Sequence, residues 1–504
     1  MEEQPLILSI DIGTSNCSVS LFTINGKKIH ETKRNLSIIS LSPGFFEHNP
    51  KELWISVKTC VKNITRKFKE KVDSIVAVGI AGHMPSPIPI DKNGTPLMNC
   101  ILHLDTRAKP QVEKTLRKIG ENEIYLRTGI RPNATYSGFK YLWIKENKPN
   151  VYRKTYKFLE PASFVALKLT GEIGIDETHA GGTMLYNIHK RKWDAQLIDA
   201  LNMDIVKLPS VFFSTKVVGE ISGKTMDETG LAKGTQVAVG VVDSFSATFG
   251  TGVYSPETLC DISGSTTCLN TVVNKPVLDK EMRFTCYPFI FQDKWILDAT
   301  FTSGIIVDNF LKNLGIGYRN ERLYEHVEKI LKNTEIGSGK MLFFPFTGMG
   351  EQSPYWDPCM KTVLIGWSPG KKLENIVRAL YEGLTYAIKL NVDVFYEKKI
   401  KVREVISSGG GAKSREWCQM KADVLNLPVK VPSEVSTTSL GAAVIAGIAT
   451  KTISNWKDVF NRLKEEYKTY KPDKKKHKKY MQFYAIFKEI YPSVSKIFHL
   501  LAKI

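Results

Sequence analysis

Two similar short segments, about half of the chain apart, combine an aspartate with glycine, serine and threonine. They read Asp11-Ile12-Gly13-Thr14-Ser15 and Asp261-Ile262-Ser263-Gly264-Ser265-Thr266-Thr267. Each joins an apolar run that favours a strand to a second β-prone run, at residues 17–23 and 268–273. A tight turn of this composition places backbone N–H groups and hydroxyls around a pocket that suits phosphate. Two such loops could hold one nucleotide phosphate chain between two halves of a protein, whereas either loop alone is equally consistent with an ordinary hairpin turn.

Two further positions lie where α/β proteins collect functional groups. Asp243 follows the apolar run at residues 235–242, at the expected carboxyl end of a buried strand. Its alternative role is to cap the segment that follows. Gly409, Gly410 and Gly411 lie between an expected strand and an expected helix, where the backbone can approach a flat ligand and the helix start favours an anion. A plain strand-to-helix turn is the alternative there.

The elements that must position these residues occur in the same order in both halves. Strand signals dominate the first hundred residues, with hairpin turns at Asn25-Gly26 and Asn93-Gly94. In the second half, strands again precede helices. The predicted helices are 50–72, 373–397, 414–425, 440–447 and a helical tail from residue 457. This order predicts a duplicated α/β fold with domains at 1–249 and 250–450 and a C-terminal helical tail at 451–504.

Composition indicates a globular protein of the cytoplasm. Of its 504 residues, 42% are hydrophobic and 24% charged, which is ordinary for this class. Eight scattered cysteines form no Cys-x-x-Cys pair, so neither a zinc site nor a disulfide framework is expected. The N-terminus has no signal-peptide pattern, and the longest small and apolar stretch, 440–449, is far below the roughly 20 residues that span a bilayer. We expect no membrane partner.

The formal net charge of +19 attracts anions, including nucleotides and sugar phosphates. Part of the excess lies in the lysine-rich segment 471–479, for which a solvated helix start is the simplest interpretation. No zinc finger, RNA-recognition pattern or aromatic-interleaved basic stripe is present, so no nucleic-acid partner is expected. The stretch 219–225 is one residue short of a P-loop, so any ATP must be bound by other means.

Taken together and in order, the motifs resemble those of the FGGY carbohydrate kinases, within the actin-like ATPase superfamily, and are most similar to the xylulose kinase branch. The resemblance extends from about residue 6 to residue 490. It is carried by the stretches 11–15, 44–50, 104–108, 140–143, 240–243, 351–357, 375–382 and 408–419. It implies an α/β protein of two duplicated ribonuclease H-like domains with a nucleotide cleft between them.

The resemblance also implies ATP-dependent phosphorylation of a small sugar, with ATP and Mg²⁺ as cofactors. Asp243 would be the catalytic base, and Asp11 and Asp243 would hold the metal. The residues implied to bind nucleotide are Gly13, Thr14, Ser15, Gly264, Ser265, Thr266, Gly304, Gly410, Gly411 and Ala412. Those implied to bind substrate are His83, Met84, Asp105 and Ser244, and a structural role for His83 stays open.

Departures from the family pattern fall mainly in the sugar pocket. Xylulose kinases usually carry Gln-Met-His-Gly where this chain has His83-Met84-Pro85-Ser86, and Ser244 stands where Asn is frequent. D-xylulose is the first expectation for the substrate, and gluconate, ribulose and glycerol stay open as alternatives. Whether the protein forms a homodimer also stays open. A non-metabolic ATP-switch protein of the same superfamily is the rival, and the settings of Lys140 and Asp243 argue against it.

Overall fold

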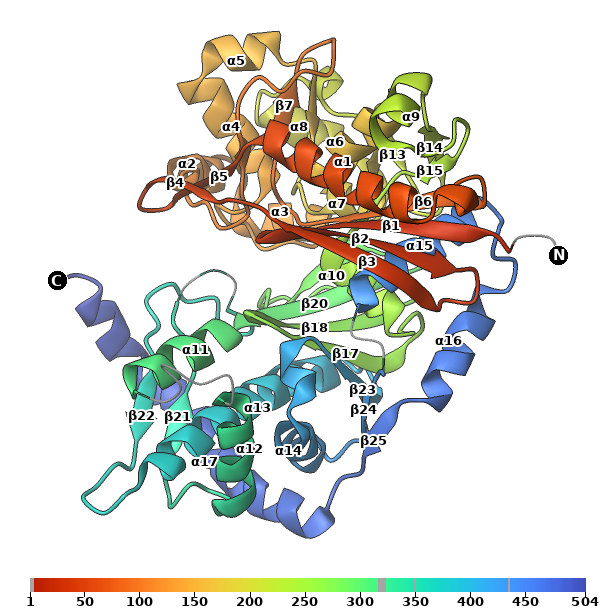
Figure 1. The fold of residues 1–504 in the computed structure, drawn as a ribbon. Helices are drawn as coiled ribbons and strands as arrows, with labels where there is room; N and C mark the ends of the chain where they lie inside the picture. Colours follow the sequence, from red (N-terminus) through yellow and green to blue (C-terminus); the bar gives the residue numbers. More distant parts are fainter. Residues whose placement is uncertain (1–3, 316–322, 349, 351, 434–435) are drawn as a thin grey trace. The chain divides into compact units, whose positions relative to one another are not determined.

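The computed structural model describes residues 4–315, 323–348, 350, 352–433 and 436–504. The chain folds into two compact units, each assembled from several stretches of sequence (Figure 1). Unit 1 comprises Met1–Tyr254, Val273–Ile296 and Ser436–Arg462, and unit 2 comprises Ser255–Val272, Leu297–Val435 and Leu463–Ile504. The consecutive domain ranges expected from the sequence, 1–249, 250–450 and 451–504, stay a prediction.

Unit 1 is built around one large sheet. Its strand order is β14-β15-β6-β1-β2-β3, and β16 also pairs with β6. The bounds are β1 Leu6–Ile12, β2 Asn16–Thr23, β3 Lys28–Asn35, β6 Ile75–Gly82, β14 Val217–Glu220, β15 Gln236–Ala238 and β16 Val241–Val242. β1 runs antiparallel to β2 and parallel to β6, and β16 runs parallel to β6. The carboxyl ends of β1, β6 and β16 therefore meet at one end of the sheet.

The remaining elements of unit 1 are short strands and the helices that surround the sheet. The strands are β4 Ile39–Ser42, β5 Phe45–His48, β7 Ile88–Ile90, β8 Cys100–Ile101, β9 Lys157–Leu159, β10 Ile175–Asp176, β11 Tyr186–Asn187, β12 Lys192–Trp193, β13 Val211–Phe212 and β19 Thr285–Pro288. The helices are α1 Pro50–Lys67, α2 Lys109–Ile119, α3 Glu121–Thr128, α4 Ser137–Asn147, α5 Pro149–Lys154, α6 Pro161–Thr170, α7 Glu177–Gly181, α8 Ala195–Ala200, α9 Gly223–Thr229, α10 Asp243–Gly250, α15 Thr437–Ala449 and most of α16 Trp456–Glu465.

Helices cover both faces of the large sheet, because side chains alternate along each strand. Leu8 of β1 joins the apolar core to which Leu53 of α1 also belongs. The other face packs against α15, where Gly79 of β6 lies so close to the Ala442 carbonyl that a Cβ would be 2.1 Å from its oxygen. Figure 1 shows α1 and α15 on opposite faces. The strand ends that carry polar residues are thus fixed by packing on both sides.

Unit 2 repeats the arrangement. Its sheet has the order β19-β20-β18-β17-β23-β24-β25, in which β19 is the short strand bounded above. The bounds are β17 Glu257–Ser263, β18 Thr266–Val273, β20 Trp295–Thr302, β23 Val402–Ser408, β24 Val429–Val431 and β25 Lys468–Tyr470. β17 runs antiparallel to β18 and parallel to β23, as β1 does to β2 and β6. Asp11 pairs in register with Ala81 and Asp261 pairs with Ser407, so the two aspartates occupy equivalent positions. The expected duplicated α/β fold is confirmed.

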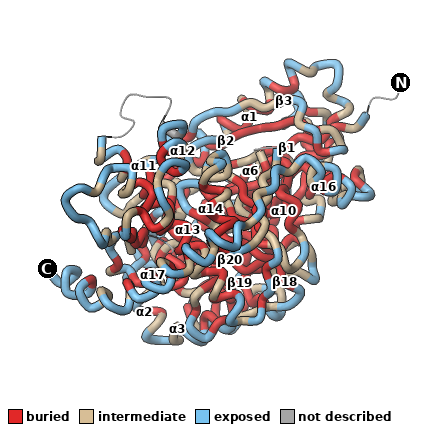
Figure 2. The backbone as a smooth tube through the Cα atoms, turned by 90° about the horizontal axis from the view of Figure 1, so that it is seen from below, coloured by how far each residue is buried: buried red, intermediate tan, exposed pale blue. Residues whose placement is uncertain are grey.

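The helices of unit 2 include one long buried helix. The elements outside the sheet are α11 Gly304–Asn313, α12 Leu323–Asn333, α13 Leu373–Glu397, α14 Arg415–Leu425, α17 Lys474–Leu501, β21 Leu342–Phe344 and β22 Val363–Ile365. Most residues of α13 are buried, whereas the last turns of α17 are largely exposed (Figure 2). Asp473 caps α17 by accepting the N–H groups of Lys475 and Lys476. The lysine-rich segment is therefore an exposed helix start, as expected.

Most of the expected elements are present, with two differences. The helix at 373–397 is confirmed, and α1 ends at Lys67 because Phe68 leaves the helical region at φ −114°. The tail is not helical throughout, since β25 pairs with β24 at the end of the sheet before α17 begins. Gly26 and Gly94 have the positive φ that the two hairpin turns require, 82° and 72°. Among the described residues, none of the helices combines the length and the apolar character that a membrane crossing needs.

Candidate active site

Asp11, His83 and Asp243 lie together at the end of the unit 1 sheet. The last residues of β1 and β16 both stand opposite Gly82, the last residue of β6. His83 and Asp243 directly follow β6 and β16, and Asp11 is the penultimate residue of β1. The main-chain N–H of His83 donates to the Ile12 carbonyl oxygen at 3.0 Å. Residues far apart in the sequence thus converge through strand pairing, where α/β proteins commonly bind ligands.

Asp11 and Asp243 are two partly exposed carboxyl groups that lie close enough for their charges to interact. Burial, the charge of Asp243 and, less strongly, Glu31 together raise the pKa of Asp11 to about 7, against the opposing effect of Lys33. Burial raises the pKa of Asp243 to about 6, although the Ser244 N–H donates to its Oδ1 at 2.6 Å. A carboxylate with a raised pKa is a stronger proton acceptor, so Asp243 has the character of a general base.

The same pair of carboxylates fits a divalent cation such as Mg²⁺. Hard carboxylate oxygens are the ligands that Mg²⁺ prefers, usually with several waters retained. Among the described residues, nothing donates a hydrogen bond to the Asp11 carboxylate, which is partly exposed at the end of β1. A cation would relieve the repulsion that raises the pKa of Asp11. Asp11 and Asp243 would hold it.

His179 stands behind Asp243 and was not indicated by the sequence. Its Nδ1–H donates to Asp176 Oδ2 at 2.5 Å, and its Nε2 lies 3.2 Å from the Gly82 carbonyl oxygen. Burial alone would lower the pKa of His179, but the Asp176 carboxylate outweighs it and raises that pKa. Its charge in turn opposes the rise in the pKa of Asp243. His179 therefore tunes the candidate base without a motif that sequence reasoning could recognise.

The segment after β6 is held by a buried lysine. Lys140 Nζ donates to the carbonyl oxygens of Pro85, at 2.8 Å, and Leu102, at 2.7 Å. Burial lowers the pKa of Lys140 to about 7. Met84 is half-buried and packs so tightly on Gly182 that a Cβ there would lie 2.2 Å from the Met84 sulfur. Lys140 thus ties together two segments that carry candidate substrate-binding residues.

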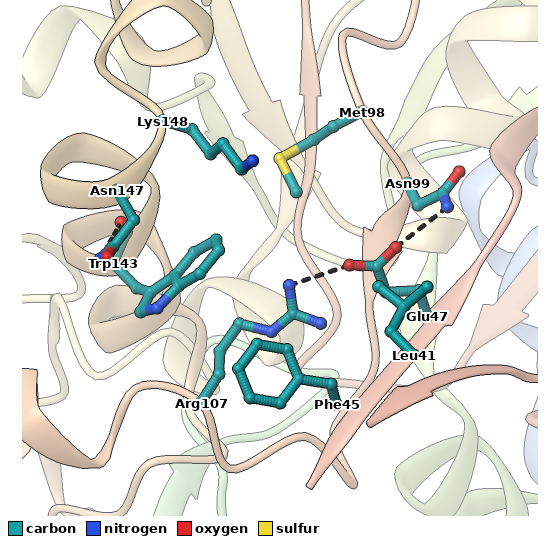
Figure 3. Close-up of a pocket in the computed structure, with 9 residues that line it drawn as sticks. All are labelled: Leu41, Phe45, Glu47, Met98, Asn99, Arg107, Trp143, Asn147 and Lys148. Atoms are coloured by element: carbon teal, nitrogen blue, oxygen red, sulfur yellow. Dashed lines mark hydrogen bonds and ion pairs between the residues drawn. The ribbon is translucent and has the colours of Figure 1, made fainter. Parts of the chain in front are cut away.

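Asp105 is engaged by its own surroundings. Both of its carboxylate oxygens accept hydrogen bonds from Arg107, and Oδ2 also accepts the Phe46 N–H at 2.7 Å. Arg107 pairs with Glu47 and lies over the rings of Phe45 and Trp143 at the wall of an open pocket (Figure 3). These contacts support a positioning role, and direct contact of Asp105 with substrate stays a prediction. Ser244, the other substrate candidate, is half-buried and follows Asp243.

The first phosphate-loop candidate is a tight turn between β1 and β2. The Gly13 N–H donates to the Asn16 carbonyl oxygen at 2.9 Å, and the Ser15 carbonyl accepts the Leu36 N–H. The hydroxyl groups of Thr14 and Ser15 make no hydrogen bond to the described residues, and Ser15 is exposed. They are available to a ligand.

The second loop candidate contacts the start of α11. The Gly264 N–H donates to the Thr266 carbonyl oxygen at 2.8 Å, which closes a turn like that at Gly13. The Gly304 N–H donates to the Gly264 carbonyl oxygen at 3.1 Å, and the Ile305 N–H donates to that of Ser265 at 3.2 Å. A Cβ on Gly304 would lie only 2.2 Å from the Gly264 oxygen. The structure therefore brings Gly264, Ser265, Thr266 and Gly304 together within unit 2.

The glycine triplet lies beside the same loop. Gly409, at φ 82°, and Gly411 both pack against Ser263, and a Cβ on Gly411 would also meet the Trp417 ring at 2.4 Å. Gly410, Gly411 and Ala412 form a short 3₁₀ turn before α14. Backbone from three distant segments, at residues 263–266, 303–305 and 409–412, thus forms one surface in unit 2. Its proposed role in nucleotide binding stays a prediction.

Comparison with known proteins agrees with these observations. The chain matches the family model of the FGGY carbohydrate kinases, N-terminal domain, over residues 6–250 and that of the C-terminal domain over residues 261–450. It is 27% identical to a xylulose kinase of Bacillus subtilis, covering 96% of each chain, and 28% identical to a glycerol kinase of Thermococcus kodakarensis, covering 90% of each. Its fold superposes on the crystal structure of a gluconate kinase from Lactobacillus acidophilus with a TM-score of 0.92 at 23% identity, covering 99% of this chain and all of that one.

Proposed function

Because this chain belongs to the FGGY family of carbohydrate kinases, we propose that it transfers the γ-phosphate of ATP to a terminal hydroxyl group of D-xylulose. The observation that carries the proposal is Asp243, a half-buried carboxylate whose pKa is raised to about 6, at the carboxyl end of a strand and beside Asp11. The family membership makes the protein a sugar kinase, which leaves the ATP-switch alternative without support.

In the proposed reaction, Asp243 accepts the proton of the attacking hydroxyl group. The hydroxyl oxygen then forms a bond to the γ-phosphorus of ATP, and the bond from that phosphorus to the β,γ-bridging oxygen breaks, which releases ADP. When bound, Mg²⁺ neutralises negative charge on the phosphates. Asp11 and Asp243 would hold it. A primary hydroxyl group is uncrowded, so it reaches the base in line with the γ-phosphate more readily than a ring hydroxyl.

D-xylulose is proposed because xylulose kinases are among the relatives with the longest shared length, and because the sequence from 408 to 423 resembles that branch. Identity of 27% does not separate this substrate from those of gluconokinases and glycerol kinases at 26% and 28%. Gluconate, ribulose and glycerol therefore belong in the same test. Residues 82–86, which depart from the xylulose kinase pattern, are the reason to test them together.

The experiment that tests the proposal is a coupled assay of ADP release with about twenty sugars and polyols, run on the wild type and on Asp243→Asn. Loss of a general base typically lowers the rate by about 10²–10⁴. We expect one acceptor to stimulate ADP release in the wild type, and Asp243→Asn to lose that stimulation while it still binds nucleotide. Wild-type turnover in the variant would reject Asp243 as the base. No stimulation by any acceptor would reject the kinase activity.

A further inference from the structure

Asp357, Cys359 and His499 bring three different metal-binding groups together in unit 2. A carboxylate oxygen, a thiol sulfur and an imidazole nitrogen from these residues all lie within 4.8 Å of one another. Among the described residues, this is the one such group of three. In a tetrahedral site with metal–ligand distances of about 2.0–2.3 Å, ligand atoms are about 3.3–3.8 Å apart. The three donor atoms therefore need only small shifts to share one ion.

The turn that carries Asp357 and Cys359 is held in place by the fold. The Cys359 N–H donates to Asp357 Oδ1 at 2.8 Å, and the Met360 N–H donates to the Asp357 carbonyl oxygen at 3.3 Å. Gly348 packs so closely on this turn that a Cβ there would lie 2.3 Å from the Pro358 carbonyl oxygen. The carboxylate and the thiol are thus positioned before an ion arrives, which lowers the entropic cost of binding one.

The third group comes from the last turn of α17, which is anchored although much of its surface is exposed. Phe498, next to His499, is buried, and its ring lies 6.5 Å from that of Phe344 in β21. Two turns earlier, Tyr491 stacks on Tyr355 with ring centroids 4.1 Å apart. The helix end that carries His499 is therefore fixed against β21 and the turn that follows Tyr355.

The contacts of the Asp357 carboxylate resemble those of a metal ligand. Its Oδ2 accepts the Tyr491 hydroxyl at 2.9 Å and lies 3.1 Å from His499 Nε2. Hydrogen bonds of this kind orient ligating carboxylates. An ion pair with a protonated His499 accounts for the 3.1 Å contact alone, but it leaves the thiol of Cys359 without a role. The side chain of His499 is 55% exposed, so an ion can enter from solvent.

The donor set indicates which ion fits. Thiolate and imidazole are ligands of Zn²⁺, whereas Mg²⁺ and Ca²⁺ prefer sites made only of oxygen. Three protein ligands leave the fourth tetrahedral position for a water molecule. A thiol must lose its proton to bind the metal, so a Zn–S bond forms as the S–H bond breaks and the proton passes to solvent.

We propose that Asp357, Cys359 and His499 bind Zn²⁺, with a water molecule as the fourth ligand, and that the ion fastens the end of α17 to the turn at 357–360. This site is separate from the Mg²⁺ of the proposed kinase reaction, whose aspartates belong to unit 1. Metal binding is measured without ATP or acceptor, so its failure and the failure of the proposed function are distinguishable.

The fastened turn is attached to the sheet of unit 2. Just before it, the Gln352 side chain donates to the Thr302 hydroxyl at 2.6 Å, and the Ser353 N–H donates to the Thr300 carbonyl oxygen at 2.9 Å. Thr300 and Thr302 belong to β20, which leads directly into α11. Zn²⁺ would therefore link the end of the helical tail to the strand that precedes α11.

The first test measures metal binding by the full chain, purified without a polyhistidine tag and treated with EDTA. Zn²⁺ is titrated in competition with a chromophoric chelator, and Co²⁺ serves as a spectroscopic substitute. We expect one Zn²⁺ per chain and a cobalt–thiolate charge-transfer band. Cys359→Ser should lose that band. Cys359→Ser and His499→Ala should each weaken Zn²⁺ binding by more than about 100-fold, and Tyr491→Phe, which removes an orienting hydroxyl, by about 10-fold.

Matched controls separate this site from adventitious binding. Cys268 is the other cysteine that is not fully buried, and His189 is an exposed histidine that bonds the Leu126 carbonyl. Cys268→Ser and His189→Ala should bind Zn²⁺ as the wild type does. Zn²⁺ binding that is equal in all variants would show that the ion binds elsewhere and overturn the proposal. No Zn²⁺ binding by the wild type would reduce the cluster to an ion pair and overturn it as well.

The second test asks whether the ion fastens the helix. Amide hydrogen exchange is compared with and without Zn²⁺ in wild type and His499→Ala, a surface substitution that should leave the fold intact. Zn²⁺ should slow exchange at the turn 357–360 and in the last turn of α17 in the wild type only, because local opening must then break the metal bonds. Exchange that Zn²⁺ leaves unchanged in the wild type, or slows equally in the variant, would overturn the fastening.

Discussion

The loops that follow Asp11 and Asp261 are equivalent by sequence and by strand register, yet their aspartates are in opposite situations. Among the described residues, Asp11 accepts no hydrogen bond and stands near a second carboxylate, Asp243, with a pKa raised to about 7. Asp261 is fully buried, and its Oδ2 pairs with Lys421 Nζ at 2.5 Å. The fold gives the Asp11 carboxylate no partner among the described residues, whereas it neutralises the Asp261 carboxylate with Lys421.

The surroundings of Asp261 explain the difference. Its oxygens accept hydrogen bonds from the hydroxyl groups of Ser263 and Ser407 as well as from Lys421. Lys421 also lies over the Trp417 ring at 4.0 Å. In unit 1 the position of Ser407 is taken by Ala81, which offers no donor. The turn that suits phosphate is thus present in both units. We infer that, of the two carboxylates, only that of Asp11 in unit 1 takes part in the chemistry.

The largest effect expected from this comparison is on stability, in Lys421→Met. Removing one partner of a buried ion pair leaves an uncompensated charge and typically costs about 3–5 kcal/mol. The free energy of unfolding, from urea titration followed by fluorescence, should fall by that amount. Lys430→Met is the matched control, because Lys430 pairs with Glu404 near the surface, where such pairs contribute about 0–1 kcal/mol. Equal losses in both variants would contradict a structural role for Asp261.

The second prediction concerns activity in Asp11→Asn. The substitution keeps the size of the side chain and removes the charge proposed to hold Mg²⁺. We expect kcat to fall by about 100-fold and the Mg²⁺ concentration needed for half-maximal rate to rise, because charge stabilisation of the transferring phosphate is weakened. The check is a Mg²⁺ titration of ADP release at saturating ATP and acceptor. An unchanged titration curve would show that Asp11 has a structural role, as Asp261 does.

A smaller effect is expected at the loop of unit 2, in Gly304→Ala. The added Cβ would lie 2.2 Å from the Gly264 carbonyl oxygen, so the phosphate loop must move. We expect KM for ATP to rise roughly 10-fold with a smaller change in kcat, since misplacement of about an ångström is costly in a positioned site. Gly223→Ala is the control: Gly223 also opens a helix, and a Cβ there meets nothing within 4 Å. A lower melting temperature with an unchanged KM for ATP would show that this loop does not belong to the nucleotide site.

Much of the fold follows from local patterns, and the candidate site follows from them only in part. Apolar runs ending in Asp11, Asp261 and Asp243 predict strand ends with functional groups, and the structure has each aspartate at such an end. The pairing of Asp261 with Lys421 spans 160 residues, so no local pattern indicates it. Because the sequence does not show this pairing, the similar segments around Asp11 and Asp261 suggested similar roles for the two loops.

The coupling of His179 to the candidate base was not predicted, for the same physical reason. His179 is coupled to Asp243 only because α7 packs against β16. Tertiary contacts of this kind decide which polar residue is free to bind a ligand and which is already satisfied.

The smallest predicted effect is that Asp11→Asn stabilises the protein when Mg²⁺ and nucleotide are absent. The pKa of Asp11 is raised from an ordinary value near 3.8 to about 7 by burial and by Asp243 and Glu31, against the opposing effect of Lys33. A carboxyl group whose pKa is higher in the folded state destabilises that state once it must ionise. The cost is absent below about pH 4, grows between pH 4 and 7, and is complete above pH 7. Asparagine avoids it.

Because Asp11 is partly exposed, we expect a gain of only about 1 kcal/mol in the free energy of unfolding at pH 8 and almost none at pH 4. Urea titrations of wild type and Asp11→Asn in EDTA at both pH values measure it. Saturating Mg²⁺ with ADP should stabilise the wild type more than the variant and so reverse the order. Asp261→Asn provides the contrast, because removing a paired buried charge should destabilise the protein at pH 8. If Asp11→Asn were also destabilising in EDTA at pH 8, Asp11 would have a partner in the fold, and the difference between the two loops would disappear.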